Sequence, residues 1–324
     1  MRKRLTIFFA AAAGLALFSS EAWAYRKVGV SGFNFLKISQ GVRGVGMGDA
    51  VVAATTGIEA AYWNPAGLTA IQKLAFNFSY TRWFVDSALH AGAVGYRFGN
   101  QVLGLSLVTF NPKSTPVTTI LQPKGTGERV AVNSGTVGLL YAVRFTDKFS
   151  FGTRLSYIWE NLGKYGDVKA ENNTVMVDFG TVFRTGFRSL RLAMSFKNFG
   201  PDNKMGQISP TLKLDRKFFM PLTFDIGIAA EVLGKRDGNG FMTLAIDNVY
   251  PIDYEQRVHV GAEVGIYKLL YLRGGYKWNY DVEGLAGGLG VKVSLGRYKT
   301  GFDFAYSQAK YFDSPIRGAM TLEF

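Results

Sequence analysis

The stretch KTGFDFAYSQ, Lys299–Gln308, alternates strictly between large apolar side chains and small or polar ones. Phe302 and Phe304 fall on one face of an extended chain, while Asp303 and Ser307 fall on the other. A period of two predicts a β-strand, because successive side chains of a strand point to opposite sides. The contrast between the two faces predicts an apolar environment on one side and a polar, crowded one on the other.

The same alternation runs through most of the chain from Leu74 onward, for example in RVHVGAEVGIY (Arg257–Tyr267) and SLRLAMSFKN (Ser189–Asn198). It predicts about fourteen antiparallel strands of roughly 9 to 14 residues, the length that a tilted strand needs to cross a bilayer. The strands are expected to centre near Phe78, Val94, Leu105, Leu139, Leu155, Val177, Leu192, Phe224, Leu244, Val260, Leu272, Leu289, Phe304 and Met320.

The linkers between these strands alternate in length. Tight turns such as Gly99–Asn100 alternate with longer connections such as Asn111–Val132 and Asn161–Asn172. Short turns at one end and long loops at the other are typical of outer-membrane barrels, whereas a soluble β-sandwich follows no such rule. The expected fold class is therefore all-β, an antiparallel transmembrane β-barrel of about 14 strands.

The two ends of the chain also indicate an exported barrel. Residues 1–24 combine a basic start, an apolar run and a small-residue cleavage site, so we expect a signal peptide. A membrane anchor, the alternative, would need a longer apolar run. The last strand, IRGAMTLEF, ends in Phe324 and resembles the C-terminal signal that barrel-assembly machinery reads. The expected divisions are a signal peptide (1–24), an N-terminal hatch or plug with short helices inside the lumen (25–72) and the barrel (73–324).

The composition limits the classes of partner that this protein is expected to bind. The formal net charge is +13 and there is no cysteine. An exported protein rarely meets nucleic acid, so the basic balance favours outer-membrane lipid or lipopolysaccharide. The polar strand faces carry charges that are candidates for the lumen, or alternatively for a solvated face. These candidate residues are Arg154, Asp178, Arg184, Glu231, His259 and Arg273.

The segment before the first strand, GVRGVGMGDAVVAATTGIEAAYWNPAGL (Gly41–Leu68), has the look of a nucleotide-binding turn. Its glycines are spaced G-x-G-x-G rather than G-x-G-x-x-G, and antiparallel strands follow instead of a βαβ unit. The glycines are better explained as sharp turns in a narrow lumen. We expect one helix over residues 50–55, capped by Asp49, and a second over residues 57–63, closed by Asn64.

This segment resembles the N-terminal hatch signature of the PorV/PorQ family, which is related to the FadL outer-membrane transporters. The matching positions are Arg43, Gly46, Gly48, Asp49, Trp63, Asn64, Pro65 and Ala66. The resemblance implies a barrel whose lumen admits hydrophobic molecules. For PorV-like members it implies a component of type IX secretion that holds exported cargo.

Three functions are therefore open: a hatch-gated conduit for hydrophobic small molecules, a type IX component that binds secreted protein cargo, and an outer-membrane enzyme. The last is the weakest, because the chain has only two histidines and nothing pairs them with a serine or a carboxylate. We expect no catalytic residues, no cofactor and no metal. The expected location is the outer membrane of a Gram-negative-type bacterium.

Overall fold

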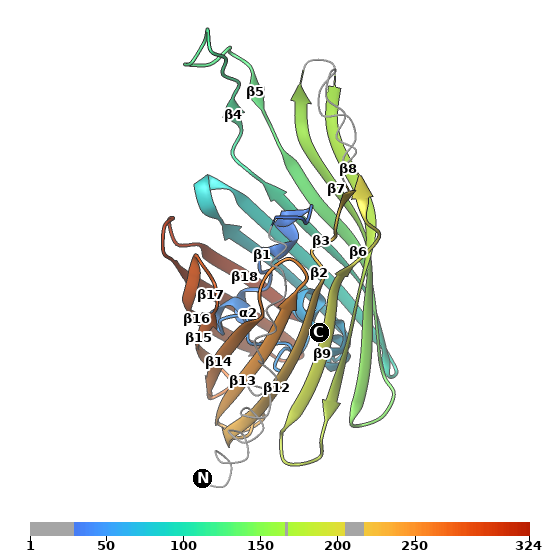
Figure 1. The fold of residues 1–324 in the computed structure, drawn as a ribbon. Coiled ribbons are helices and arrows are strands. Elements are labelled where there is room, and N and C mark those ends of the chain that lie inside the picture. Colours follow the sequence, from blue (N-terminus) through green and yellow to red (C-terminus); the bar gives the residue numbers. More distant parts are fainter. Residues whose placement is uncertain (1–28, 166–167, 205–216) are drawn as a thin grey trace.

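A computed structural model describes residues 29–165, 168–204 and 217–324, and Figure 1 shows their arrangement. Fourteen strands, antiparallel throughout, close into a barrel in which the first strand pairs with the last. The predicted fold class is confirmed. The predicted signal peptide lies outside the described residues, as do the first residues of the expected hatch.

The barrel strands follow one another around the ring in chain order. They are β1 (Leu74–Arg82), β2 (Ala88–Phe98), β3 (Gln101–Asn111), β6 (Asn133–Arg144), β7 (Phe149–Tyr165), β8 (Val168–Arg184), β9 (Arg191–Phe199), β12 (Thr223–Gly234), β13 (Gly240–Pro251), β14 (Arg257–Ile266), β15 (Leu270–Trp278), β16 (Glu283–Leu295), β17 (Tyr298–Ala309) and β18 (Ile316–Glu323). Every strand centre expected from the alternation lies within one of them.

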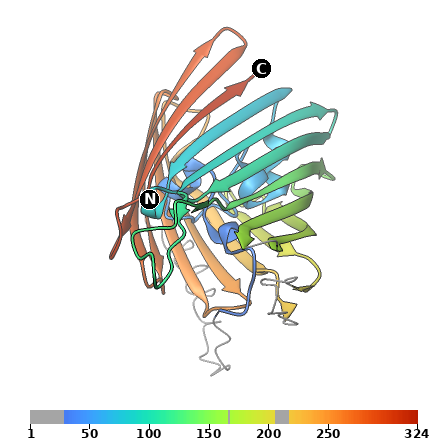
Figure 2. The same ribbon diagram turned by 90° about the horizontal axis from the view of Figure 1, so that it is seen from above.

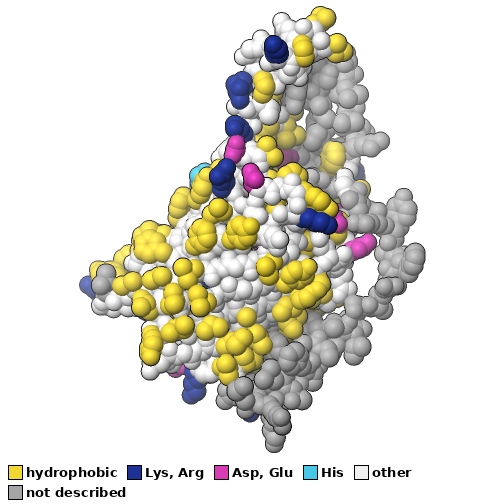
Figure 3. Space-filling model, turned by 90° about the vertical axis from the view of Figure 1, so that its left-hand side faces the viewer, with side chains coloured by type: hydrophobic (Ala, Val, Ile, Leu, Met, Phe, Trp, Pro, Cys, Tyr) yellow, Lys and Arg dark blue, Asp and Glu magenta, His cyan; other side chains and the backbone are white. Residues whose placement is uncertain are grey.

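The two faces of the wall differ as the alternation predicts. In β1, Phe76, Phe78 and Tyr80 are exposed on the outside, while Asn77 and Ser79 are buried inside. Most of the coloured side chains on the barrel wall in Figure 3 are hydrophobic, and the charged ones lie mainly toward the end that carries the projecting arm. An apolar exterior on a closed barrel is the arrangement that a lipid bilayer stabilises. In the described part of the chain no helix is long and apolar enough to cross a membrane.

The predicted division into short turns and long loops holds only in part: the connections 112–132 and 200–222 are long, but 252–256, 279–282 and 310–315 at the same end are no longer than the longest turn at the other end, 185–190. The expected loop Asn161–Asn172 is largely strand, because β7 and β8 each run for 17 residues and pair beyond Asn161. Strand pairing uses backbone groups, so the polar side chains there did not prevent it. The predicted loop Asn111–Val132 carries a small hairpin of β4 (Thr115–Pro116) and β5 (Arg129–Val130), which forms the arm in Figure 1. Another short pair, β10 (Asn203–Lys204) and β11 (Lys217–Phe218), precedes β12.

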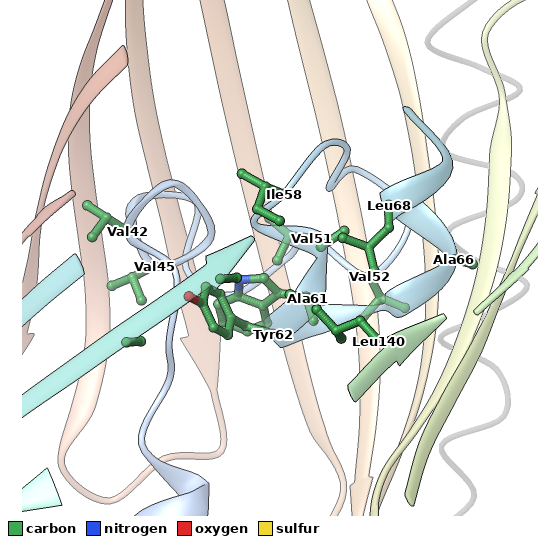
Figure 4. Packing of buried hydrophobic residues seen from close by; sticks show 14 of the residues in the cluster. Val42, Val45, Val51, Val52, Ile58, Ala61, Tyr62, Ala66, Leu68 and Leu140 are labelled. Carbon is green, nitrogen blue, oxygen red and sulfur yellow. The ribbon is translucent and has the colours of Figure 1, made fainter. Parts of the chain in front are cut away.

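Residues 29–73, the inner segment, lie within the ring of strands, as Figure 2 shows from above. Their elements are η1 (Asn34–Lys37), α2 (Val42–Gly46), α3 (Ala60–Trp63) and η2 (Pro65–Ala70); a further short turn, η3 (Phe84–Asp86), joins β1 to β2. Apolar side chains of the inner segment pack against one another and against wall residues such as Leu140, as Figure 4 shows. The core of the molecule is therefore the filled lumen.

The expected helices of this segment were partly wrong. Residues 50–55 form turns, and a helix lies instead at Val42–Gly46. Asp49 does not cap a helix, because it has a left-handed backbone and its carboxylate binds Lys277 of the wall. The second helix is shorter than expected but does end before Asn64, whose side chain accepts a hydrogen bond from Ala66 and starts η2.

The path of the inner segment also differs from expectation. Because β1 begins at the short-turn end, the segment that precedes it is expected to enter the barrel from that end. Instead, the backbone N–H of Gly32 donates to Phe219, and Lys37 pairs with Asp253, both in connections at the long-loop end. The chain then descends through the lumen to Leu74 at the short-turn end. Residues 29–40, which we call the strap, thus lie across the long-loop end.

The C-terminal residue completes the ring. The backbone N–H of Phe324 donates to the carbonyl of Leu74 at 2.8 Å, next to the start of β1. Its ring meets Phe76 and Tyr298 edge-on, at centroid distances of 6.1 and 5.2 Å. The predicted assembly signal therefore lies on the seam between the first and last strands.

Candidate functional site: the contact between the inner segment and the wall

Glycines of the wall form the first contact with the inner segment. A Cβ at Gly275 would lie 2.2 Å from the carbonyl carbon of Met47, and one at Gly261 would lie 2.2 Å from the Met47 oxygen. A Cβ at Gly288 would be 3.0 Å from the Cα of Gly46. Only glycine permits backbone to approach backbone this closely. Residues 46–48 therefore lie flat on β14, β15 and β16.

A second glycine contact lies on β7 and β8. A Cβ at Gly152 would be 2.3 Å from the carbonyl carbon of Pro65, and one at Gly180 would be 2.2 Å from the amide oxygen of Asn64. The Asn64 amide nitrogen donates to the carbonyls of Val52 and Thr181, each at 3.1 Å. Asn64, Pro65 and Ala66 of the predicted motif thus fix the inner segment to these strands.

Trp63, also in the motif, packs within the inner segment. Its indole covers the backbone of Gly41 and Gly44, where an added Cβ would come within 2.6 Å of the ring. Its carbonyl accepts a hydrogen bond from Ser195 of β9 at 3.0 Å. The remaining glycine of the motif, Gly48, meets the backbone of β15, since a Cβ there would lie 2.6 Å from the nitrogen of Tyr276.

Buried charges form a third contact between the inner segment and the wall. Arg43 donates to both carboxylate oxygens of Glu263 on β14, at 2.7 and 2.9 Å. Glu263 also accepts from Arg273 at 2.8 Å and from Arg236 at 3.1 Å. Arg273 in turn pairs with Asp303 at 2.6 Å. Bidentate, charge-assisted hydrogen bonds of this kind fix geometry strongly.

A separate charged cluster surrounds Asp49. Its carboxylate accepts from Lys277 at 2.6 Å and from Ser39 at 2.5 Å. Lys277 also pairs with Glu283 at 3.2 Å. His259, predicted as a lumen residue, is buried nearby and shares a hydrogen bond of 2.8 Å with Tyr280.

The other predicted lumen charges take different roles. Arg154 and Asp178 are buried and bind each other, so they pair within the wall rather than with the inner segment. Glu231 accepts hydrogen bonds from both terminal nitrogens of Arg191. The Nε of Arg191 donates to the carbonyl of Ala53 in the inner segment at 3.2 Å. Arg184 lies near the short-turn end, and its Nη1 has no hydrogen-bond partner.

Sequence reasoning missed several residues that hold the inner segment. Glu263 and Lys277 are the main ones, and Asp247 is another, since it accepts from the backbone N–H of Val52 at 2.7 Å. All three lie on inward positions of their strands, so the alternation could have identified them as lumen residues. It could not have shown which inner residue each one contacts.

A cavity of about 130 Å³ lies between the strap and the wall. Apolar and aromatic side chains line part of it, including Leu36, Ile38 and Trp63. Charged residues line the rest, among them the ion pair of Lys197 and Asp225, which are 2.8 Å apart. The cavity therefore offers an apolar surface beside fixed charges.

Asp253 secures the strap above this cavity. Burial raises the pKa of Asp253, but hydrogen bonds from Lys37 and Ser31 outweigh this and hold the pKa below its ordinary value. Because the folded pKa is depressed, the carboxylate stabilises the strap above its unfolded pKa of about 3.9, and this contribution is lost as pH falls through the folded value.

We therefore expect Asp253→Asn to loosen the strap at neutral pH, because the substitution removes the charge that Lys37 neutralises. Hydrogen exchange of residues 29–40 should become faster in the variant. The wild type should show the same acceleration only in acid, after correction for the intrinsic pH dependence of exchange. Equal protection of the strap in both proteins at pH 7 would show that Asp253 does not hold it.

Comparisons with known proteins bear on the fold. No family model matches the chain, and no curated protein matches it by sequence. The resemblance to the PorV/PorQ family therefore stays a prediction.

Solved structures do match. The Ralstonia pickettii toluene transporter TbuX is 14% identical, with 88% of this chain and 97% of that chain covered at a TM-score of 0.61. The Pseudomonas putida toluene transporter TodX is 12% identical, with coverage of 88% and 99% and a TM-score of 0.61. A Pseudomonas aeruginosa FadL homologue is 11% identical, with coverage of 88% and 98% and a TM-score of 0.55. The chain thus has the barrel fold found in these toluene transporters and in the FadL homologue.

Proposed function

We propose that this protein is an outer-membrane conduit for hydrophobic small molecules and that the inner segment is its hatch. The observation that carries the proposal is the cavity of about 130 Å³ between the strap and the wall. An engineered apolar cavity of about 150 Å³ holds a benzene molecule, so a compound of one aromatic ring is of suitable size. The shared fold with toluene transporters supports the same class of compound.

The proposed location is the outer membrane of a Gram-negative-type bacterium, after export by a cleaved signal peptide. The apolar exterior supports contact with outer-membrane lipid and lipopolysaccharide. The position of Phe324 on the barrel seam supports insertion by barrel-assembly machinery.

The test is uptake of radiolabelled toluene by cells whose outer membrane has an intact lipopolysaccharide leaflet. Cells that express the wild-type chain should take up toluene faster than cells that carry an empty vector. Equal initial rates in the two strains, with the barrel present in the membrane, would refute a conduit.

A role in type IX secretion remains the second candidate, and one observation favours it. The tip of the arm carries Ile120 and Leu121, which are 99% and 92% exposed. Apolar side chains free in solvent are typical of interaction sites. Copurification of the chain with secreted proteins would support this role, provided that Ile120→Ser with Leu121→Ser abolishes it. Toluene uptake by the same double variant should stay at the wild-type rate if the conduit proposal is right.

A further inference from the structure

Arginines gather on one side of the lumen at the short-turn end. Arg97, Arg144 and Arg184, which we call the arginine row, stand near the ends of β2, β6 and β8. Each lies two positions from an inward residue, namely Gly95, Ala142 and Val182, so all three belong to the inner face. The arginine row therefore borders the opening of the lumen at the short-turn end, the end that faces the periplasm in outer-membrane barrels.

Backbone carbonyls of the inner segment satisfy some of the donors of this row. Arg144 donates to Thr69 at 2.7 Å, and Arg97 donates to Ile71 at 3.2 Å. Two donors are left over, because the Nε of Arg144 and the Nη1 of Arg184 are buried and have no partner. A guanidinium keeps its charge at any ordinary pH, so these donors cannot be relieved by deprotonation.

The charge of the row is also uncompensated at short range. Within the described residues, no carboxylate lies at ion-pair distance from any of the three arginines, although Asp147 acts on Arg144 from further away. Arg184 is close enough to Arg144 and Arg191 for their charges to repel, and Arg144 is similarly affected by Arg97. Like charges held together without an anion destabilise the structure.

The opposite side of the same opening is different. There Arg236 and Arg273 share Glu263. Arg191, which pairs across the strands with Arg184 on the side of the row, has Glu231 as its partner. A cavity of about 190 Å³ lies beside Arg236, Glu263 and Arg273, and its arginines already have carboxylate partners, while its lysine, Lys292, lies over the ring of Tyr271. Among the described inward-facing arginines at this end, those without a carboxylate partner are therefore the ones of the arginine row.

We propose that the arginine row binds a carboxylate, and that the compounds which leave the lumen here are small monocarboxylic acids with an apolar body. This inference rests on the proposed conduit and narrows its substrates. Planar guanidinium groups match the two oxygens of a carboxylate, and the bound anion also relieves the repulsion between Arg144 and Arg184. A neutral hydrocarbon offers the row no such contact.

Binding is the first test, with benzoate as the probe and benzyl alcohol as its neutral counterpart. Calorimetry on the full chain in detergent should show benzoate binding, weakened about tenfold by Arg184→Gln, since one charge-assisted contact is lost. The Arg184 side chain makes no hydrogen bond to the described residues, so this variant should fold normally; Arg144→Gln with Arg184→Gln should weaken binding further. Arg184→Lys should restore part of the affinity.

Arg188→Gln is the matched control, because Arg188 is an exposed cation of the neighbouring turn that lies over Phe187 at 5.4 Å. It should leave benzoate affinity unchanged, and benzyl alcohol should bind all variants alike. Benzoate affinity that does not change in Arg184→Gln and in the double variant would overturn the proposal. So would an equal loss for benzyl alcohol, because that would indicate general damage to the lumen.

Toluene uptake separates this inference from the conduit itself. If both proposals are right, cells that express Arg184→Gln should take up toluene at the wild-type rate, because toluene has no carboxylate and the Arg184 side chain makes no hydrogen bond to the described part of the inner segment. Normal toluene uptake together with unchanged benzoate binding would overturn the arginine row and leave the conduit standing. Wild-type cells that fail to take up toluene faster than vector controls would remove the conduit, and the inference with it.

Discussion

Replacing Gly275 with alanine is expected to push residues 46–48 off the wall and make the barrel leaky. The added Cβ would lie 2.2 Å from the carbonyl carbon of Met47 and 2.4 Å from the nitrogen of Gly48. Both are backbone atoms, which cannot turn aside as a flexible side chain can. Overpacking of this kind costs about 1–3 kcal/mol, and the contact between the inner segment and the wall is where it would be relieved. Swelling of liposomes in a small sugar should therefore become faster.

The neighbouring residue provides the control for this experiment. A Cβ at Gly274 would have nothing within 4 Å, so Gly274→Ala adds the same methyl group to the same strand without a clash. We expect this variant to swell at the wild-type rate. If Gly275→Ala also swells at that rate while both barrels are folded, the inner segment does not depend on the glycine contact with β15.

Replacing Glu263 with glutamine should have the largest effect on stability. The substitution leaves Arg43, Arg236 and Arg273 without the carboxylate that they share, in a place where the Glu263 side chain is fully buried. Removal of one partner from a buried ion pair costs about 3–5 kcal/mol, because the remaining charge stays desolvated. Urea unfolding of the barrel in lipid, followed by tryptophan fluorescence, should shift to a lower midpoint.

Glu128→Gln is the matched control, since Glu128 is exposed in the arm that projects beyond the barrel. Its unfolding midpoint should equal that of the wild type. A Glu263→Gln midpoint that equals it too would mean that the three arginines find other partners. In that case the ionic network would not hold the inner segment to the wall.

How well the sequence predicts each part of the structure depends on whether local patterns or distant contacts determine that part. The strands around Phe78 and Phe304 were predictable because lipid outside and a crowded lumen inside impose a period of two. The ends of β7 and β8 were not, since beyond the bilayer the polar residues near Asn161 no longer follow that contrast. Backbone pairing alone extends those strands.

The inner segment was predictable in composition but not in detail. The glycines around Gly46 and the sequence Asn64-Pro65 do make close turns, as expected from their backbone preferences. The helix positions were wrong because elements of four to six residues have little stability of their own. Contacts with the wall decide where they form. Glu263 and Arg43 illustrate the same point, because residues so distant in sequence show no pattern that would pair them.

The central claim is that residues of the inner segment fill the lumen of a lipid-embedded barrel. Conductance in planar bilayers tests it most directly, by comparing the full chain with a chain that lacks residues 41–67. The account predicts that the shortened chain, once its barrel is shown to be folded, conducts in larger steps than the full chain. Conductance at the level of the full chain would contradict it, because a lumen that the inner segment fills must open when that segment is removed.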